Sequence, residues 1–164
     1  MYSLINWVIE TLNATALSSF IMGNAWFFPM LEMLHFFGLC LLFGSLLIVD
    51  LRVIGLAPRV PLSRVEIFVR VTLVGFAINI ATGTLFVIGD SDRYLVNIAF
   101  WLKMGVIVLA GLNTAWFVRR IRPQIDAGLE GAALSADARV VAGASLVFWT
   151  AVIILGRMIP YVEE

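Results

Sequence analysis

The sequence predicts an all-α fold: an integral membrane four-helix bundle with an N-terminal amphipathic helix at the membrane interface. Hydrophobic residues make up 62% of the chain and charged residues 13%, a balance far from that of soluble domains. Several apolar runs contain about 20 residues, enough to cross a hydrocarbon core of roughly 30 Å as helices. Lipid admits only helices or closed barrels, and these runs lack the alternating pattern of barrel strands, so helices are expected.

The expected elements follow in chain order. Residues 1–25 place apolar side chains at helical spacing, with Asn6, Glu10 and Asn13 off that stripe. This pattern predicts a short helix lying on the outer membrane face, with a partly buried, frayed terminus as the alternative. Residues 26–164 form the bundle, with spans expected at about 29–51, 67–89, 97–117 and 140–158.

Basic residues set the predicted orientation of the bundle. Arg93, Lys103 and Arg157 are the only bases on the side that holds both termini. The loop regions after the first and third spans hold the other eight, which are Arg52, Arg59, Arg64, Arg70, Arg119, Arg120, Arg122 and Arg139. The positive-inside rule therefore predicts cytoplasmic arginine-rich loops and both termini outside.

Composition also narrows the classes of partner and chemistry. The formal net charge is zero, which argues against nucleic acid as a partner and leaves the lipid bilayer as the expected environment. The single cysteine, Cys40, falls inside the first apolar run. An intrachain disulfide, a CxxC pair and a CxxCH haem-attachment motif are therefore all ruled out.

The only histidine, His35, lies in the apolar run LEMLHFFGLC, roughly 9 Å into the first span from the outer face. Lys103 lies at the same expected depth in the third span. Glu32 precedes His35 by about one helical turn, and Arg157 ends the fourth span at the same boundary. Ionisable residues are costly inside a membrane, so their convergence in one half of the bilayer is a functional-site hypothesis.

Each of these residues also has a plainer interpretation. Lys103 would snorkel to the headgroups, and Arg157 would anchor the interface. Glu32 would only pair with one of these two cations. His35 would be a hydrogen-bonded packing residue.

Haem b is the cofactor that fits the pattern best. Its iron takes a neutral imidazole nitrogen, its macrocycle needs an apolar slot, and its propionates need Lys or Arg near water. We therefore expect His35 to bind the iron, and Lys103 and Arg157 to neutralise the propionates or to orient a quinone-like substrate. With one histidine, the iron would be five-coordinate, would take Met or Lys103 as its sixth ligand, or would lie between protomers.

Other residues complete the expected site. Gly38, one turn from His35, would let a flat ring approach the helix backbone, although small residues are also ordinary packing devices in membranes. Two tryptophans would line the pocket. The full expected set is Glu32, His35, Gly38, Trp101, Lys103, Trp149 and Arg157.

Two further groups of polar residues lie within or beside the spans. Gly75, Asn79 and Thr82 fall at helical spacing in the second span, which predicts an interhelical hydrogen-bonding contact or a ligand contact. A salt-bridge cluster is expected at the cytoplasmic boundary, formed by Asp50, Arg52, Glu66 and Arg70. Proton relay through Asp50 would need a matching acid deep in another span, and the sequence shows none.

Motifs spread over nearly the whole chain resemble those of a family of small four-span bacterial inner-membrane proteins of unassigned function. They are His35-x2-Gly38, Gly44, Asp50-Leu51-Arg52-x2-Gly55, Phe100-x2-Lys103 and Gly156-Arg157-x-Ile159-x-Tyr161. The resemblance implies a bacterial inner-membrane protein, which makes the outer side periplasmic. More loosely, a histidine in an early span and a lysine in the third are similar to the membrane protoporphyrinogen oxidases and the copper-resistance protein D group. That similarity implies a role in activity for His35 and Lys103.

These observations lead to one expected function. The chain would bind haem b and transfer electrons between a periplasmic-side partner and a membrane carrier, as an oxidoreductase or as the membrane subunit of one. It would act as a homo-oligomer or with a separate redox partner, because it has no soluble catalytic domain. The alternative is a cofactor-free structural or anchoring subunit of a larger membrane complex. A small transporter ranks below both, because no inverted repeat or broken-helix pair is visible.

Overall fold

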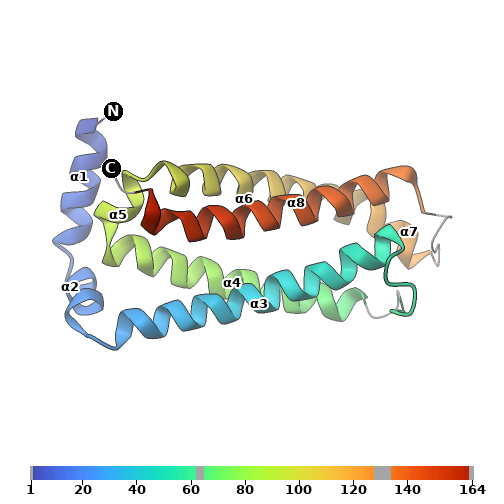
Figure 1. The fold of residues 1–164 in the computed structure, drawn as a ribbon, viewed down its shortest axis with the longest axis horizontal. Helices are drawn as coiled ribbons and strands as arrows, with labels where there is room; N and C mark the ends of the chain where they lie inside the picture. Colours follow the sequence, from blue (N-terminus) through green and yellow to red (C-terminus); the bar gives the residue numbers. More distant parts are fainter. Residues whose placement is uncertain (1, 62–64, 128–133, 163–164) are drawn as a thin grey trace.

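The computed structural model describes residues 2–61, 65–127 and 134–162, and these residues form an all-helical bundle (Figure 1). Its long helices are α3 (Phe27–Ile54), α4 (Val65–Gly89), α6 (Ile98–Trp116) and α8 (Ala136–Met158). A π-helical segment η2 (Phe117–Ile121) and α7 (Arg122–Asp126) prolong α6, and a 3₁₀ turn η4 (Ile159–Tyr161) ends α8. The four long helices, with these extensions, are long and apolar enough to cross a membrane. The predicted all-α bundle is confirmed, and the helices extend beyond the predicted spans.

Three short helices gather at one end of the bundle. They are α1 (Tyr2–Asn13), α2 (Ala16–Gly23) and α5 (Ser91–Leu95). Figure 1 shows α1 running across this end, which also holds both termini, while α7 lies at the opposite end. We call these two ends the terminal end and the α7 end.

Specific contacts fix the short helices to the bundle. The amide of Asn13 on α1 donates to the Asp92 carboxylate of α5 over 2.7 Å, and its oxygen accepts from Ser91 over 2.7 Å. Ile21 of α2 is fully buried against Gly89, where α4 ends. The side chain of Trp7 on α1 remains 62% exposed. The first helices are therefore attached to the bundle but keep an apolar surface.

Asn97 joins the start of α6 to the end of α8. Its side-chain oxygen accepts from the backbone N–H groups of Ala99 and Phe100, at 2.9 and 3.3 Å, which caps α6. Its amide donates to the carbonyls of Ile159 and Val162, at 2.9 and 3.0 Å. Because Asn97 is only 4% exposed, this one side chain satisfies four backbone groups that would otherwise lack partners.

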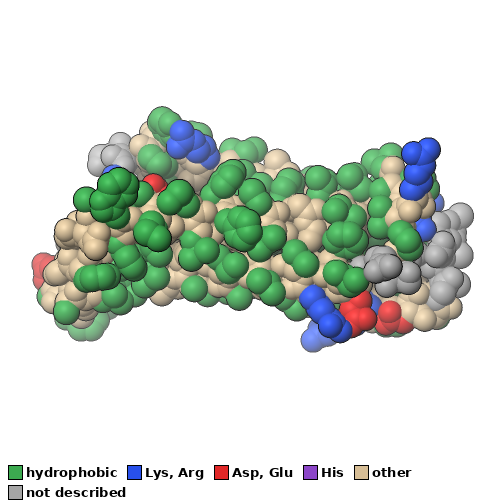
Figure 2. Space-filling model, turned by 90° about the horizontal axis from the view of Figure 1, so that it is seen from below, with side chains coloured by type: hydrophobic (Ala, Val, Ile, Leu, Met, Phe, Trp, Pro, Cys, Tyr) green, Lys and Arg blue, Asp and Glu red, His purple; other side chains and the backbone are tan. Residues whose placement is uncertain are grey.

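The outside of the bundle is apolar along its length. Figure 2 shows hydrophobic side chains covering the flank in view, with the charged side chains gathered toward the ends. Phe36, Leu112 and Val147 are 64–67% exposed, although they lie in the middle of long helices. Such a surface suits lipid and not water, so the bilayer environment predicted from composition is supported.

Helices α3 and α4 cross in very close contact. A Cβ atom on Gly75 would lie 2.5 Å from the backbone nitrogen of Leu42 and 2.6 Å from the carbonyl oxygen of Gly38. Hydrogen bonds flank this crossing, between His35 and Thr82 on one side and between Ser45 and Thr72 on the other, both at 2.7 Å. In each facing pair the two residue numbers add to the same value, as expected for antiparallel helices in register.

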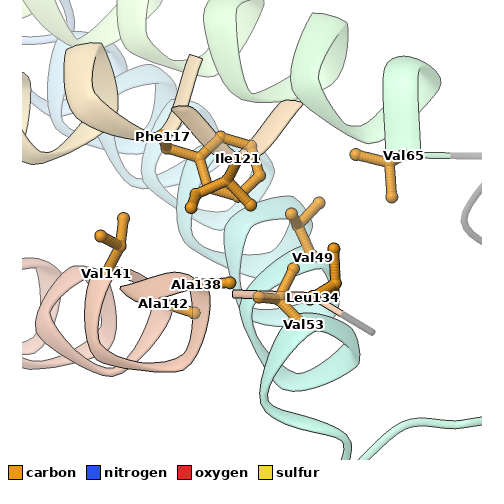
Figure 3. Packing of buried hydrophobic residues seen from close by; sticks show 9 residues of the cluster. All are labelled: Val49, Val53, Val65, Phe117, Ile121, Leu134, Ala138, Val141 and Ala142. Atoms are coloured by element: carbon orange, nitrogen blue, oxygen red, sulfur yellow. The ribbon is translucent and has the colours of Figure 1, made fainter. Parts of the chain in front are cut away.

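Buried side chains form separate clusters along the bundle axis. The cluster nearest the α7 end joins α3, α4, η2 and α8 (Figure 3), and consists of Val49, Val53, Val65, Phe117, Ile121, Leu134, Ala138, Val141 and Ala142. A second cluster, in the middle, is built on Leu42, Ala110, Trp149 and Val152. A third, near the terminal end, contains Ile21, Leu31 and Phe86. Polar side chains lie between these clusters.

The close crossing makes Gly75 sensitive to any side chain. We expect Gly75→Ala to lower the thermal unfolding midpoint in detergent, at a cost of about 1–3 kcal/mol, because the new methyl group meets backbone atoms that cannot rotate away. The matched control is Gly111→Ala on α6, where no atom lies within 4 Å of the added Cβ. Circular dichroism melts of both variants make the measurement. Equal midpoints for the two variants would contradict the crossing geometry.

Candidate functional site

The structure gives His35 a specific hydrogen-bond partner on the neighbouring helix. Its Nδ1 atom lies 2.7 Å from the Thr82 hydroxyl oxygen, and Thr82 is only 2% exposed. The Thr82 hydroxyl donates its one hydrogen to the carbonyl of Ile78, over 2.7 Å. When the hydroxyl donates to Ile78, its oxygen can only accept from His35 Nδ1–H, and this tautomer leaves the Nε2 lone pair of a neutral imidazole without a partner in the pair.

Aromatic rings separate His35 from the terminal end. The imidazole packs against Phe86 at a centroid distance of 5.2 Å, and Phe28 contacts the same ring at 5.3 Å. Tyr94 of α5 stacks on Phe86 at 6.2 Å, and Phe100 packs edge-on against Tyr94. The imidazole is thus covered by apolar rings on the side nearest to water.

Lys103 is the second ionisable residue that the structure brings to this level. Its side chain runs inward from α6 to α8, where Nζ lies 3.3 Å from the position that a Cβ would take on Gly156. The ammonium is also close enough to His35 to interact with it electrostatically. Lys103 is half-buried. The predicted pairing of His35 and Lys103 at one depth therefore holds in the structure.

Two predicted site residues on α3 do not face this site. The space beside Gly38 is filled by Ile78 and Asn79 of α4, which a Cβ would meet at 2.7 and 2.9 Å. Gly38 therefore serves helix packing and leaves no clearance for a ring. Glu32 is exposed and lies close enough to Tyr94 to act on it electrostatically.

The tryptophans and Arg157 also lie apart from the imidazole. Trp101 is 50% exposed on the outer surface, where its indole N–H donates to the Leu95 carbonyl over 2.9 Å. Trp149 is buried deeper, in the middle cluster, with its indole N–H unpartnered. Arg157 is exposed at the terminal end and donates to the Tyr161 hydroxyl over 2.8 Å. The structure therefore brings together only two of the seven predicted residues.

The prediction of one salt-bridge cluster at the cytoplasmic boundary is wrong, because Asp50 does not join the pair formed by Glu66 and Arg70. Glu66 and Arg70 pair with each other on the exposed face of α4. Asp50 instead points into the bundle, where it is 3% exposed and one of its oxygens has no hydrogen-bond partner. The helical spacing of Glu66 and Arg70 fixes their own pairing, whereas the inward direction of Asp50 depends on how α3 meets α8.

Two features of the site were predicted only in part or not at all. Thr82 was predicted to make an interhelical hydrogen-bonding contact or a ligand contact, and the structure shows such an interhelical contact, with His35 as the partner that the sequence did not identify. Tyr94 is not among the residues predicted for the site, whereas its ring stacks on Phe86, which packs against the imidazole. In both cases the pairing depends on the register between helices, which spacing along one helix does not reveal.

The fold and this site define a class: a multi-pass membrane protein with a polar pair between its first two spans, the half-buried His35 and the buried Thr82. A family model matches residues 20–162, and the chain therefore belongs to that family, described as a family of unknown function (DUF6644). No curated protein and no solved structure gives a significant match.

The orientation of His35 can be tested directly because the chain has one histidine. With ¹⁵N-labelled histidine in an untagged protein, we expect the two ring-nitrogen shifts of an Nδ1–H tautomer. Thr82→Val removes the hydroxyl at nearly constant volume, so we expect the shifts to move toward a tautomer mixture. The matched control is Thr84→Val, because the exposed Thr84 bonds only to its own helix. Shifts that are unchanged in Thr82→Val would contradict the contact.

Burial raises the pKa of Tyr94 to about 12, from about 10 in an unfolded chain. The folded state therefore holds this proton more tightly than the unfolded state does. The resulting stability is fully present below pH 10 and is lost as the pH rises toward 12. We expect the free energy of unfolding to fall more steeply across this range in the wild type than in Tyr94→Phe, which keeps the ring.

Denaturant unfolding at several alkaline pH values, with tyrosinate absorbance as a second signal, makes this measurement. Tyr161→Phe is the control, because Tyr161 is 66% exposed. A wild type and a Tyr94→Phe variant with parallel pH dependence would show that the Tyr94 phenol is accessible to water in the folded protein.

Proposed function

We propose that this protein binds haem b through His35 and carries electrons between a periplasmic-side partner and a membrane carrier. The observation that carries the proposal is the hydrogen bond from His35 Nδ1 to Thr82. Histidines that bind metals usually donate their other ring N–H to a fixed acceptor, which sets the tautomer and the ring orientation. The Nδ1–H tautomer of His35 would have this arrangement, with Nε2 as the available nitrogen.

The small number of potential metal ligands near one another favours haem over a metal ion held by protein side chains alone. Among the described residues, no group of three or more His, Cys, Asp or Glu side chains gathers to hold an ion. A zinc or copper site needs three or four such ligands. Haem iron needs only one or two from the protein, because the porphyrin nitrogens supply the others. One oriented imidazole in an apolar bundle therefore suits haem.

The chain's other residues would hold and shield the group. Lys103, at the level of His35, would neutralise one propionate, and Arg157 at the terminal end would reach another near water. Phe86 and Tyr94 would keep water from the imidazole. Met33 and Met158 are 64% and 42% exposed toward lipid, which argues against either as a sixth ligand. One-electron chemistry would come from the iron itself.

The orientation proposed from the sequence places the terminal end in the periplasm of a bacterium. The described bases at the α7 end outnumber those at the terminal end, and Arg64 lies outside the described residues. An inner-membrane location with both termini periplasmic is therefore part of this proposal. A donor on that side, and a second copy or a separate subunit as redox partner, would complete the electron path.

A second candidate is a cofactor-free anchoring subunit of a larger membrane complex. One observation favours it: side chains already fill the space beside two glycines near the site. Ile78 and Asn79 occupy the space at Gly38, and Lys103 occupies the space at Gly156. Under this interpretation, His35 and Thr82 are an interhelical polar pair that holds α3 against α4.

An absorption spectrum separates the two candidates. We expect untagged protein, expressed with a haem precursor and purified in detergent, to show a Soret band. His35→Gly should lose the band, and added imidazole should restore it by occupying the vacated position. The tag is omitted because its histidines would supply ligands of their own.

Phe36→Ala is the matched control for this experiment, because Phe36 is adjacent to His35 but 67% exposed. It should keep the full band. A wild type that is folded and colourless would refute haem binding and favour the anchoring subunit. A band that survives in His35→Gly without imidazole would place the ligand elsewhere.

A further inference from the structure

Asp50 is buried in the half of the bundle opposite to His35. It lies on α3, four residues before that helix ends, and its side chain is 3% exposed. Ser145 of α8 is the hydrogen-bond partner of its carboxyl group. The oxygen Oδ2 is buried and has no partner. The proposed haem site uses neither residue.

Asp50 lines a small cavity of about 70 Å³ between α3, α4, α6 and α8, which is partly open at the surface beside the exposed Leu73 and Val118. The polar side chains lining it besides Asp50 are Thr72, Asn113, Thr114 and Ser145. All four are neutral, and the other lining residues are apolar. The apolar cluster at the α7 end, shown in Figure 3, borders one side of this cavity. Three residues belong to both the cluster and the cavity lining, namely Val49, Phe117 and Val141. The volume is enough for about two water molecules at roughly 30 Å³ each.

Two of the four polar side chains that line the cavity, Thr72 and Thr114, can act only as acceptors toward it. Thr72 donates its hydroxyl hydrogen to the Phe68 carbonyl, and Thr114 donates to the Ala110 carbonyl, both at 2.9 Å. Toward the cavity, these two hydroxyls therefore present only lone pairs. An ionised carboxylate needs donors or a cation to compensate for its burial. A protonated carboxyl group needs an acceptor for its O–H, and this lining provides acceptors.

The charged groups on the surrounding helices do not line this cavity. On α4, Glu66 and Arg70 are exposed and pair with each other. Arg119 and Arg120 of η2 are exposed, as are Asp137 and Arg139 of α8. Arg52, two residues along α3, is half-buried and has contacts of its own. On α6, Lys103 is ten residues from Asn113, roughly 15 Å along the helix. None of these residues lines the cavity.

We propose that Asp50 is a proton-binding site, whose carboxyl group is held neutral inside the bundle and exchanges its proton through this cavity. The site has no need of a second acid in another span, because the neutral oxygens accept a hydrogen bond from the carboxyl O–H, and water entering the pocket would carry the released proton away. A proton relay between two acids is therefore not required. One buried acid, with hydrogen-bond acceptors around it, is enough to bind a proton. This inference is independent of haem binding.

Infrared spectroscopy of the detergent-solubilised protein tests the proposal. We expect the C=O band of a protonated carboxylic acid at neutral pH, with the shift in D₂O that an exchangeable O–H causes. Asp50→Asn should abolish the band. Asp137→Asn, at an exposed acid, should leave it unchanged. Ser145→Ala should shift it, because Ser145 is the partner of Asp50.

Titrations of the wild type provide a second test that needs no variant. Raising the pH should remove the band, whereas adding Na⁺ at constant pH should not. A missing band at neutral pH would overturn the proposal, because the carboxyl group would then be ionised. A band that Na⁺ removes at constant pH would also overturn it, in favour of a metal-cation site.

Discussion

The close crossing of α3 and α4 is the constraint on which the rest of the structure depends. Two helices can approach to backbone contact only where both lack side chains, and Gly38 and Gly75 provide this. The contact fixes the register of the pair. With that register set, His35 meets Thr82 toward the terminal end and Ser45 meets Thr72 toward the α7 end. A different register would remove these interhelical hydrogen bonds, at a cost of roughly 0.6–2 kcal/mol each.

The sequence was sufficient for the fold and for part of the site. Span length and apolar composition determine which segments are helical, because lipid leaves the backbone no other way to satisfy its hydrogen bonds. Depth along a span also follows from residue number, which is why Lys103 was correctly placed at the level of His35. Direction around the helix axis was harder to predict. Trp101 points outward to the Leu95 carbonyl, although its depth would have suited the pocket.

The errors share a physical cause. Amphipathic patterning is weak in helices that have lipid on one side and apolar packing on the other, so the sequence says little about which face is buried. Gly38 illustrates this, because a glycine that clears space for a ligand and one that admits a neighbouring helix have the same sequence signature. Asp50 is a similar case, since an acid near a span end is consistent with both a surface ion pair and a buried carboxyl group. Only the packing of α3 against α8 distinguishes them.

Both polar sites lie on α3, and their separation limits how strongly one influences the other. His35 and Asp50 are fifteen residues apart, roughly 22 Å along the helix. At an effective dielectric constant of about 20, two unit charges at that distance interact by about 0.7 kcal/mol, a change of roughly threefold in an equilibrium constant. Direct electrostatics would therefore couple a charge at His35 only weakly to a proton at Asp50. Stronger coupling would have to be mechanical, through a shift of α3 against α4. The backbone contact at Gly75 resists such a shift. The hydrogen bonds on both sides of the crossing resist it as well, because neither helix can move without breaking them.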